Sequence, residues 1–362
     1  MLRVTMVRLR LTRIGWGLVI HPRILGIGTA NPPVRLTQEQ SFHAAGYQGE
    51  RIRKIFLNSD IDHRHFYLEG ALNREESSDQ LNQRYLRGAI KTGCRAILNC
   101  VKVAGTTVQD VDFLAVCTCT GYVCPDVGSR LIAHMGFSNR VQRASIIGLG
   151  CAGALPTLQR AVDFVRANPG RQALMLAVEI CSACYYVDST LETVVGNAIC
   201  GDGAAAFLLA AGQQGNRSYP QIIDFETFID TEQIEEVGLQ HRDGKLRIVL
   251  GVSIQHLAGP MIETALQQLL QRHGLSRSRI GFWVVHPGGR KVINNVQKHF
   301  GMTDAQLHFS RTVLRNYGNM SSPTIMFVLE EVVRSGNPRP GDWGVMIALG
   351  PGMAAEVALL RW

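Results

Sequence analysis

The sequence predicts an α/β protein in which buried strands alternate with helices, and two observations carry this prediction. Short apolar runs recur along the chain, as over residues 112–118, 173–179 and 280–285, and each is too short for a typical helix. Runs of this kind are typical of strands that are buried on both faces. Between them lie longer segments whose apolar residues recur every three or four positions, which is the helical period. This alternation favours a parallel sheet covered by helices.

The same order of strands and helices occurs in both halves of the chain, which suggests an internal duplication although the halves share few residues. We expect an N-terminal extension over residues 1–22, a first half over 23–215 and a second half over 216–362. The polar, glycine-rich segment 212–218 is the best candidate for the junction. Residues 1–38 lack Asp and Glu, as transit peptides do, but they contain no secretory apolar core or cleavage site.

The composition is that of an ordinary soluble globular protein with a large interior. The 362 residues are 46% apolar and 18% charged, which suits two domains or one duplicated core. The net charge of +8 comes from scattered basic residues, so it fits an anionic small molecule. No nucleic-acid motif and no apolar run of membrane-spanning length are present. The nine cysteines are an odd number and lie mostly in apolar runs, which predicts reduced thiols in a reducing compartment, the cytoplasm.

The expected elements follow from the period and length of each apolar segment. The first half contains a strand at 23–30, helices at 42–57 and 81–103, a strand at 112–118, a helix around 129–135, a buried strand at 143–147, a helix after residue 153, and strands at 173–179 and 201–209. The second half contains a helix at 261–273, a strand at 280–285, helices around 292–300 and 324–333, and strands at 343–349 and 355–360.

Cys151 lies where the strand at 143–147 gives way to the next helix. At a helix N-terminus the free backbone N–H groups and the macrodipole favour an anion, so a thiol there loses its proton more easily. Cys151 is therefore a candidate nucleophile, although an inert buried cysteine is a common alternative.

The segment from Gly148 to Gly153 also matches the G-x-G-x-x-G pattern of dinucleotide-binding proteins. That fold places an acidic residue about 20 positions later, and the nearest candidate here, Glu179, comes too late. A second short motif, Cys181-Ser-Ala-Cys184, lacks further ligands at zinc spacing, and a redox function for it is weakly supported.

Two further polar residues are expected at the edge of the same sheet. His286 follows the strand at 280–285, and Asn319 lies in a loop of small residues before the helix at 324–333. α/β sheets place their functional groups at the carboxyl ends of strands. A cysteine, a histidine and an asparagine brought together there could act as nucleophile, base and oxyanion donor. Each also has an ordinary structural explanation, so the pattern alone leaves the triad open.

Four segments of the chain resemble the signature segments of one enzyme family. They are Gly148-Leu-Gly-Cys151-Ala-Gly, Val285-His286-Pro-Gly-Gly, Tyr317-Gly-Asn319-Met-Ser-Ser and Gly350-Pro-Gly352. The chain is identified by them as a member of the type III polyketide synthases, the chalcone synthase-like enzymes of the thiolase superfamily. The resemblance runs from about residue 23 to 362, and within the family the chain is most similar to the bacterial dihydroxyphenylacetyl-CoA synthases. It implies the duplicated five-layer αβαβα fold and a homodimer.

The resemblance also implies an activity. Cys151 carries the growing chain as a thioester, and His286 forms an ion pair with it. His286 and Asn319 bind the thioester oxygen of malonyl-CoA, whose decarboxylation supplies the enolate for a Claisen condensation; neither a metal nor an organic cofactor is needed. Cyclisation then releases a small aromatic compound or a pyrone. Malonyl-CoA alone is the expected source, with a fatty-acyl starter as a close alternative.

The resemblance assigns substrate-binding positions by their match to the family. The implied residues are Arg51 and Lys54 for the CoA phosphates, with Asn58 at the third basic position, and Cys119, Thr120, Cys184, Gly196, Cys200, Ser321, Gly350, Pro351 and Gly352 around the cavity. Cys200 replaces a bulky phenylalanine of chalcone synthases, so a wider gate is expected. A second gate phenylalanine falls near Arg247, and a methionine that crosses the dimer interface matches Cys124.

Two other functions remain open at this level. One is a stand-alone ketosynthase that joins chains bound to an acyl-carrier protein. The other is an NAD-dependent oxidoreductase, which would depend on the Gly148 motif. Starter unit, number of extensions and cyclisation depend on the shape of the cavity.

Overall fold

The structure is a computed structural model that describes residues 20–70, 76–184, 186–211, 218–251 and 253–362. The expected extension over 1–22 and the expected junction at 212–218 lie almost wholly outside the described residues. The division of the chain at these two places stays a prediction.

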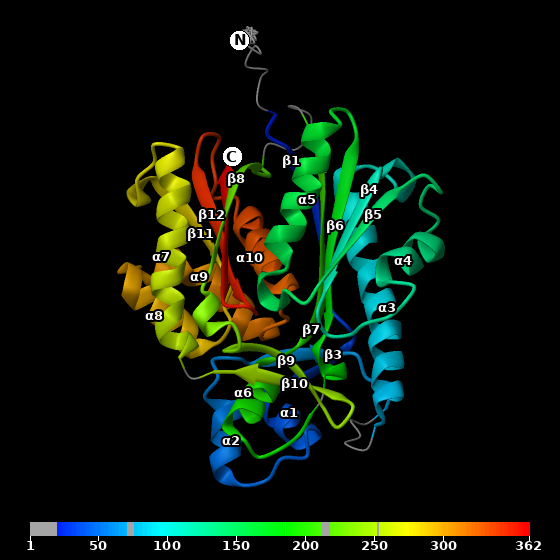
Figure 1. Cartoon of the computed structure of the whole chain (residues 1–362), viewed down its shortest axis with the longest axis vertical. Coiled ribbons are helices and arrows are strands. Elements are labelled where there is room, and N and C mark those ends of the chain that lie inside the picture. Colours follow the sequence, from blue (N-terminus) through cyan, green and yellow to red (C-terminus); the bar gives the residue numbers. More distant parts are fainter. Residues whose placement is uncertain (1–19, 71–75, 185, 212–217, 252) are drawn as a thin grey trace, which may run out of the picture.

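A nine-stranded mixed sheet runs through the molecule in the order β11-β12-β13-β8-β1-β7-β6-β4-β5 (Figure 1). Its strands are β1 (Arg23–Ala30), β4 (Phe113–Thr118), β5 (Gln142–Ile147), β6 (Gln172–Ile180), β7 (Asp202–Ala210), β8 (Gln221–Ile229), β11 (Ile280–Val285), β12 (Trp343–Gly350) and β13 (Ala354–Arg361). The two halves meet where β1 pairs with β8 at Arg23 and Gln221.

The expectation of a parallel sheet is partly wrong. β4 is parallel to β5 and β6, and β11 is parallel to β12, whereas the other pairs in this sheet are antiparallel. Short connections explain the difference, since β12 and β13 are joined by residues 351–353 and a turn that short reverses the chain. An apolar run in the sequence does not indicate whether a strand pairs parallel or antiparallel to its neighbours.

Helices cover the faces of the sheet, and the order of the layers is the αβαβα order that the resemblance implies. They are α1 (Gln38–Ala44), α2 (Glu50–Leu57), α3 (Ser78–Ala104), α4 (Val127–Met135), α5 (Ala154–Ala167), α6 (Leu191–Ile199), α7 (Ile254–Arg272), α8 (Arg290–Phe300), α9 (Asp304–Tyr317) and α10 (Pro323–Arg334). α5 and α10 lie between the two halves of the sheet, α3 packs outside the first half, and α7 packs outside the second (Figure 1). The order is therefore helix, sheet, helix, sheet, helix.

Three apolar cores hold these layers together. The inner core joins α5 and α10 to the facing sides of both half-sheets, with Leu158 and Phe327 among its buried members. The first outer core joins α3 to the other side of the first half. The second outer core joins α7 and α8 to the other side of the second half and includes Ile262 and Val296. Burial of these faces is the main source of stability in such a layered protein.

Local sequence signals explain where several helices begin and end. α3 begins after a capping box in which Ser77 and Gln80 satisfy each other's backbone N–H groups, and it ends at Gly105 in the left-handed conformation. α9 begins after the same arrangement of Thr303 and Gln306. The single helix expected over 42–57 is wrong: α1 and α2 are separated by a loop in which Gly46 and Gly49 have φ of 65° and 91°.

The strand that precedes Cys151 is a third correction. β5 was expected to be buried, but it is the edge strand of the sheet, and Ile147 at its end is 54% exposed. An edge strand has one neighbour, here β4, so one side of its backbone is left uncovered. An apolar composition therefore identified the strand without indicating its position in the sheet.

Two small sheets lie outside the nine-stranded sheet and were not expected from the sequence. One pairs β2 (Val34–Thr37) with β3 (His63–Phe66), and the other is the hairpin of β9 (Val237–Arg242) and β10 (Lys245–Leu250). The hairpin turns at Asp243-Gly244, both with positive φ, a pair that favours this kind of turn. It lies at the lower edge of the main sheet (Figure 1) and forms a wall of the site described next.

Candidate active site

Cys151 is held in a tight turn between β5 and α5, as the sequence predicts. The turn is a single 3₁₀ segment, Gly150–Ala152, and Gly148 and Gly150 have φ of 82° and 49°. A side chain on Gly150 would place its Cβ 2.5 Å from the ring of Pro351. The glycine is therefore required by close packing as well as by backbone conformation.

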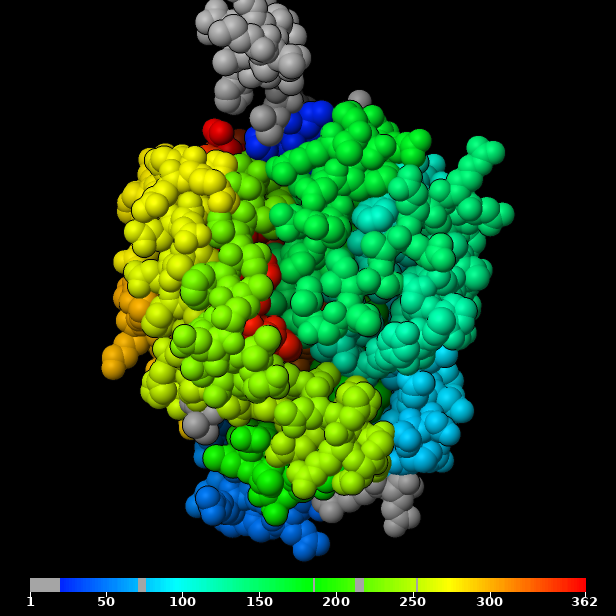
Figure 2. Space-filling view, in the orientation of Figure 1, coloured from blue at the N-terminus to red at the C-terminus, as the bar shows by residue number. Residues whose placement is uncertain are grey.

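The Gly350-Pro351-Gly352 loop supports this turn from the closing strands. A Cβ on Gly350 would lie 2.6 Å from the backbone nitrogen of Ala152, which shows how closely the two segments approach. Gly352 has φ of 75° and allows the reversal into β13. Figure 2 shows the closing part of the chain, in red, reaching the surface in the seam between green and yellow segments.

Asn319 faces Cys151 and is fixed by four hydrogen bonds. Its backbone N–H donates to the carbonyl of Ile199 at 2.8 Å, and its own carbonyl accepts from Gly201 at 3.0 Å. Its side-chain Nδ2 donates to the Gly288 carbonyl at 3.1 Å, and its Oδ1 accepts from the Ser321 N–H at 2.8 Å. In this orientation Nδ2 lies 3.8 Å from the Cys151 Sγ.

His286 lies at the end of β11, where its backbone N–H donates to the Ile347 carbonyl at 2.8 Å. The residue is buried, and neither ring nitrogen has a hydrogen-bond partner within the described part of the chain. A buried polar group without a partner is costly and is characteristic of functional sites. Cys151, His286 and Asn319 line one cavity, so the structure brings the predicted triad together.

Burial favours the neutral form of both ionisable members of the triad. Loss of water around the sulfur raises the pKa of the Cys151 thiol to about 12, which outweighs the lowering by hydrogen bonds from Ser321 and Asn319. Burial likewise lowers the pKa of His286 to about 4. The expectation that the helix N-terminus lowers the pKa of the thiol is therefore wrong for this geometry, in which desolvation is the larger effect.

These pKa directions predict how Cys151 reacts with iodoacetamide. A thiol with a raised pKa is neutral at pH 7, so we expect its alkylation rate to rise about tenfold per pH unit between pH 7 and 9. Mass spectrometry of the Cys151 peptide measures the rate, and the slope should persist in His286→Ala. A rate independent of pH in the wild type that becomes pH-dependent in His286→Ala would instead show an ion pair at rest.

The first cavity has a volume of about 660 Å³ and an amphipathic lining. Lys54 and Asn58 of the α2 region contribute to it as expected, but Arg51, although on the same helix, does not line it. Arg290 and Lys291 at the start of α8 line it and were missed. Their position directly after His286-Pro-Gly-Gly was a usable signal, since basic residues beside a helix N-terminus suit an anionic ligand.

Arg247 also lines the first cavity, but its charge is already paired. The buried guanidinium contacts Asp188 and Glu192 at 3.5 and 3.3 Å. It also donates to the hydroxyls of Thr190 and Thr193. These bonds tie β10 to the start of α6, so Arg247 positions the cavity wall.

The second cavity, of about 320 Å³, meets the first at Cys151 and Asn319. Most of the predicted cavity residues line it: Cys119, Thr120, Cys184, Cys200, Ser321 and Pro351. Gly196 lies one layer behind, because a Cβ there would touch the side chain of the lining residue Ile248 at 3.1 Å. Gly350 and Gly352 act through the loop under Cys151 and do not line it.

Glu179 supports this cavity. The sequence indicates no such function for it, only a position too late in the chain for the acidic residue of a dinucleotide site. It is fully buried and accepts hydrogen bonds from the backbone of Cys119, from the backbone and hydroxyl of Thr120, and from the hydroxyl of Ser322. Desolvation raises its pKa above the usual value. A carboxylate enclosed in this way cannot reach a ribose, which removes the structural basis of the dinucleotide interpretation.

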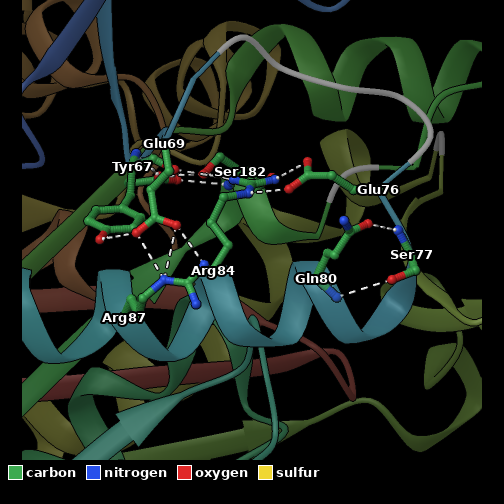
Figure 3. Close-up of polar contacts among 9 residues, drawn as sticks. Tyr67, Glu69, Glu76, Ser77, Gln80, Arg84, Arg87 and Ser182 are labelled. Carbon is green, nitrogen blue, oxygen red and sulfur yellow. Dashed lines mark hydrogen bonds and ion pairs between the residues drawn. The ribbon is translucent and has the colours of Figure 1, made fainter.

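A buried ion-pair network supports the same cavity from behind (Figure 3). The Arg84 guanidinium of α3 binds the Glu76 carboxylate at 2.9 and 3.0 Å and donates to the Ser182 hydroxyl at 2.9 Å. Ser182 donates in turn to the buried carboxylate of Asp202 at 2.6 Å. Because Ser182 lies between two cavity cysteines, Cys181 and Cys184, the network fixes the segment that carries them.

Two profiles of one family match consecutive parts of the chain. "Chalcone and stilbene synthases, N-terminal domain" matches residues 50–213, and the C-terminal domain of the same family matches residues 224–362. The chain belongs to the chalcone and stilbene synthase family. It is a type III polyketide synthase, an acyltransferase with the thiolase fold.

Individual relatives agree with this assignment over almost the whole chain. A 3,5-dihydroxyphenylacetyl-CoA synthase of Streptomyces toyocaensis is 35% identical, over 94% of this chain and 90% of its own. A 1,3,6,8-tetrahydroxynaphthalene synthase of Streptomyces peucetius subsp. caesius is 31% identical, over 94% and 93%. The crystal structure of PKS-I from the brown alga Ectocarpus siliculosus superposes with a TM-score of 0.89 at 28% identity, over 95% and 99%.

In the described part of this polyketide synthase, no helix has the length and apolarity needed to cross a membrane. The same residues contain no group of three or more His, Cys, Asp or Glu side chains that could hold a metal ion. All nine cysteines are free.

Proposed function

We propose that this type III polyketide synthase condenses malonyl-CoA units on Cys151 and cyclises the product to a small aromatic compound or a pyrone. One observation carries the proposal: Cys151, His286 and Asn319 lie together where a cavity with a basic rim meets a second cavity. The charge of the first cavity is complementary to the phosphates of a CoA thioester, and the second cavity has room for an extended chain. Several relatives are named for aromatic products of this kind.

In the loading step, the Cys151 thiol attacks the carbonyl carbon of an acyl-CoA thioester. A new C–S bond forms, the bond to the CoA sulfur breaks, and the thiol proton passes through His286 to the departing CoA thiolate. The neutral forms of Cys151 and His286 suit this order of steps, since the neutral imidazole is free to accept the proton. The ion pair that the family resemblance implies then exists during the reaction.

In the extension step, malonyl-CoA loses CO₂ and the electron pair of the broken C–C bond forms an enolate. We assign the stabilisation of the enolate oxygen to His286 and to the Nδ2 group of Asn319, which is held in place by its bond to Gly288. The enolate carbon attacks the thioester on Cys151, a C–C bond forms, and the Cys151 thiolate is released. Return of the lengthened chain to Cys151 allows another cycle.

We assign the phosphates of CoA to the basic rim of the first cavity. Lys54, Arg290 and Lys291 line it and come from two different helices, and Lys54 and Lys291 are exposed. Arg51 lies within one helical turn of Lys54 and would extend the rim. Phosphate groups favour such a surface at the start of a helix, as at Arg290 in α8.

We further propose that two copies of the chain form a homodimer at the edge of the first half. Ile147 on β5 is 54% exposed and Tyr122 is 71% exposed, although both line the second cavity. A second copy that covers this edge would enclose the cavity and bury both side chains.

The free thiols suit a reducing compartment such as the cytoplasm.

Incubation with labelled malonyl-CoA, with and without acyl-CoA starters, tests the proposed reaction. We expect mass spectrometry to detect an aromatic or pyrone product that contains the label, and CO₂ release in proportion. Product from malonyl-CoA alone supports the small-aromatic reaction. Absence of product with any CoA ester, combined with turnover of acyl groups on a carrier protein, would contradict the CoA assignment.

A further inference from the structure

We propose that His241 is the acid–base group that closes the aromatic ring of the product through a carbon–carbon bond. His241 lies in β9 and lines the second cavity, which also contains Cys151. The inference rests on the proposed function, because the chain that cyclises is the one built on Cys151. Repeated Claisen condensation gives this chain a ketone at every second carbon.

The hairpin of β9 and β10 presents one face to the second cavity. Alternate side chains of a strand point to the same face of a sheet. On this face the register pairs three residues of β9 with three of β10: Val237 with Leu250, Leu239 with Ile248, and His241 with Leu246. All six line the cavity, and five of them are aliphatic. The hairpin therefore places a single ionisable group in an otherwise apolar wall.

The imidazole of His241 is available to a bound chain. The residue is exposed, and among the described residues its side chain has no hydrogen-bond or ion-pair partner. The nearby charge of Arg247 belongs to the other face of β10, where it contacts Asp188 and Glu192. Imidazole both accepts and donates a proton near neutral pH, which suits it to acid–base catalysis.

The other titratable groups that line the second cavity are less suited to accept a proton. They are Tyr122 and the cysteines, and phenols and thiols are ordinarily protonated at neutral pH. Burial raises the pKa of Cys119 and Cys184 well above the usual value. The sulfur of Cys200 accepts a hydrogen bond from Cys181, which lowers the pKa of Cys200 and occupies the sulfur as an acceptor. His241 is therefore the best proton acceptor in this wall.

The ring closure is an internal aldol condensation. The imidazole removes a proton from a methylene carbon between two carbonyl groups, and the electron pair of the broken C–H bond forms an enolate. The enolate carbon attacks a ketone carbon of the same chain, so a C–C bond forms and the π pair of the C=O bond moves to oxygen. The imidazolium returns its proton to that oxygen, and loss of water leaves a double bond in the ring. No oxidant or reductant takes part.

The fixed position of His241 would also decide which ring forms. A chain with many ketones has several acidic methylene groups and can close in several ways. Cys151 holds one end of the chain, so an imidazole at a fixed place in the same cavity reaches only the methylene groups at one distance along it. Proximity then favours one ring over the others.

Product analysis of His241→Gln with labelled malonyl-CoA tests the inference. Glutamine still forms hydrogen bonds but does not accept a proton at neutral pH. We expect the rate of aromatic product formation to fall about 10²-fold, a usual contribution of a general base. Acyl loading of Cys151 and CO₂ release should stay near wild type, while open-chain acids and pyrones accumulate. Mass spectrometry and chromatography measure each product.

Addition of imidazole to His241→Ala distinguishes a missing base from a damaged wall. The added base should restore aromatic product in this variant and have little effect on the wild type, since it takes the place of the lost side chain. Gln240→Ala is the matched control, because Gln240 is exposed on the opposite face of β9 and should keep the wild-type product. Thermal unfolding verifies that each variant folds.

The outcomes separate the inference from the proposed function. Wild-type amounts of aromatic product in His241→Gln, or a loss in His241→Ala that imidazole does not restore, would overturn the assignment of His241. A larger loss in Cys200→Ala than in His241→Gln would move the base to Cys200, and a wild-type product closed only through a C–O bond would remove the aldol step. Absence of both acyl loading and CO₂ release in the wild type contradicts the proposed function itself.

Discussion

Replacing Cys151 by alanine abolishes acyl loading and lowers polyketide formation by at least about 10³-fold, because no other group takes the place of a covalent nucleophile. Decarboxylation of malonyl-CoA should continue, since His286 and Asn319, which stabilise the enolate, remain in place. The fold should be retained, because removing one sulfur atom from the side chain of this half-buried residue costs about 1 kcal/mol. Intact-protein mass spectrometry measures loading, and release of labelled CO₂ measures decarboxylation.

Cys94→Ala is the matched control for this experiment. Cys94 is also a half-buried free cysteine, but it lies on α3 and packs against the first outer core. Its replacement should leave loading and product formation close to wild type. Undiminished product in Cys151→Ala, or equal losses in both variants, would contradict the assignment of Cys151 as the nucleophile.

Replacing Asn319 by alanine lowers both decarboxylation and condensation by about 10² to 10³-fold, the usual effect of removing one oxyanion donor. The effect differs from that of Cys151→Ala, which spares decarboxylation. Part of the loss in the alanine variant could come from the released Ser321 N–H, since Asn319 Oδ1 accepts its hydrogen bond. Steady-state rates of CO₂ release and product formation should be measured for the same preparation.

Asn319→Asp separates these two effects. The aspartate keeps an acceptor for Ser321 but has no N–H to donate to the enolate oxygen or to the Gly288 carbonyl. We expect it to be as inactive as the alanine variant, with a thermal stability nearer to wild type. Wild-type decarboxylation in either variant would remove Asn319 from the oxyanion site.

Much of the fold is visible in the sequence because its signals are local. The strand near Asp112, the capping box at Ser77 and the glycine that ends α3 each depend on residues close together in the chain. The nucleophile is equally visible, since a cysteine between a strand and a helix needs no distant residue to be noticed. The family segments around Cys151, His286 and Asn319 then predict the triad.

The tertiary structure decided what depends on neighbours far away in the chain. It placed β5 at an edge, where Ile147 is exposed, and it reversed the pKa expectation for Cys151 by burying the sulfur. It also gave Glu179 its role, since the groups that bind this carboxylate come from segments about 60 and 140 residues away.

The sequence by itself therefore determined the class of enzyme, and it predicts which residues react. The tertiary structure decided the electrostatics and shape of the site, including the amphipathic cavity that contains Cys151, His286 and Asn319. The physical reason is that propensity and motif act over a few residues, whereas burial, pKa and cavity volume arise when distant segments pack together.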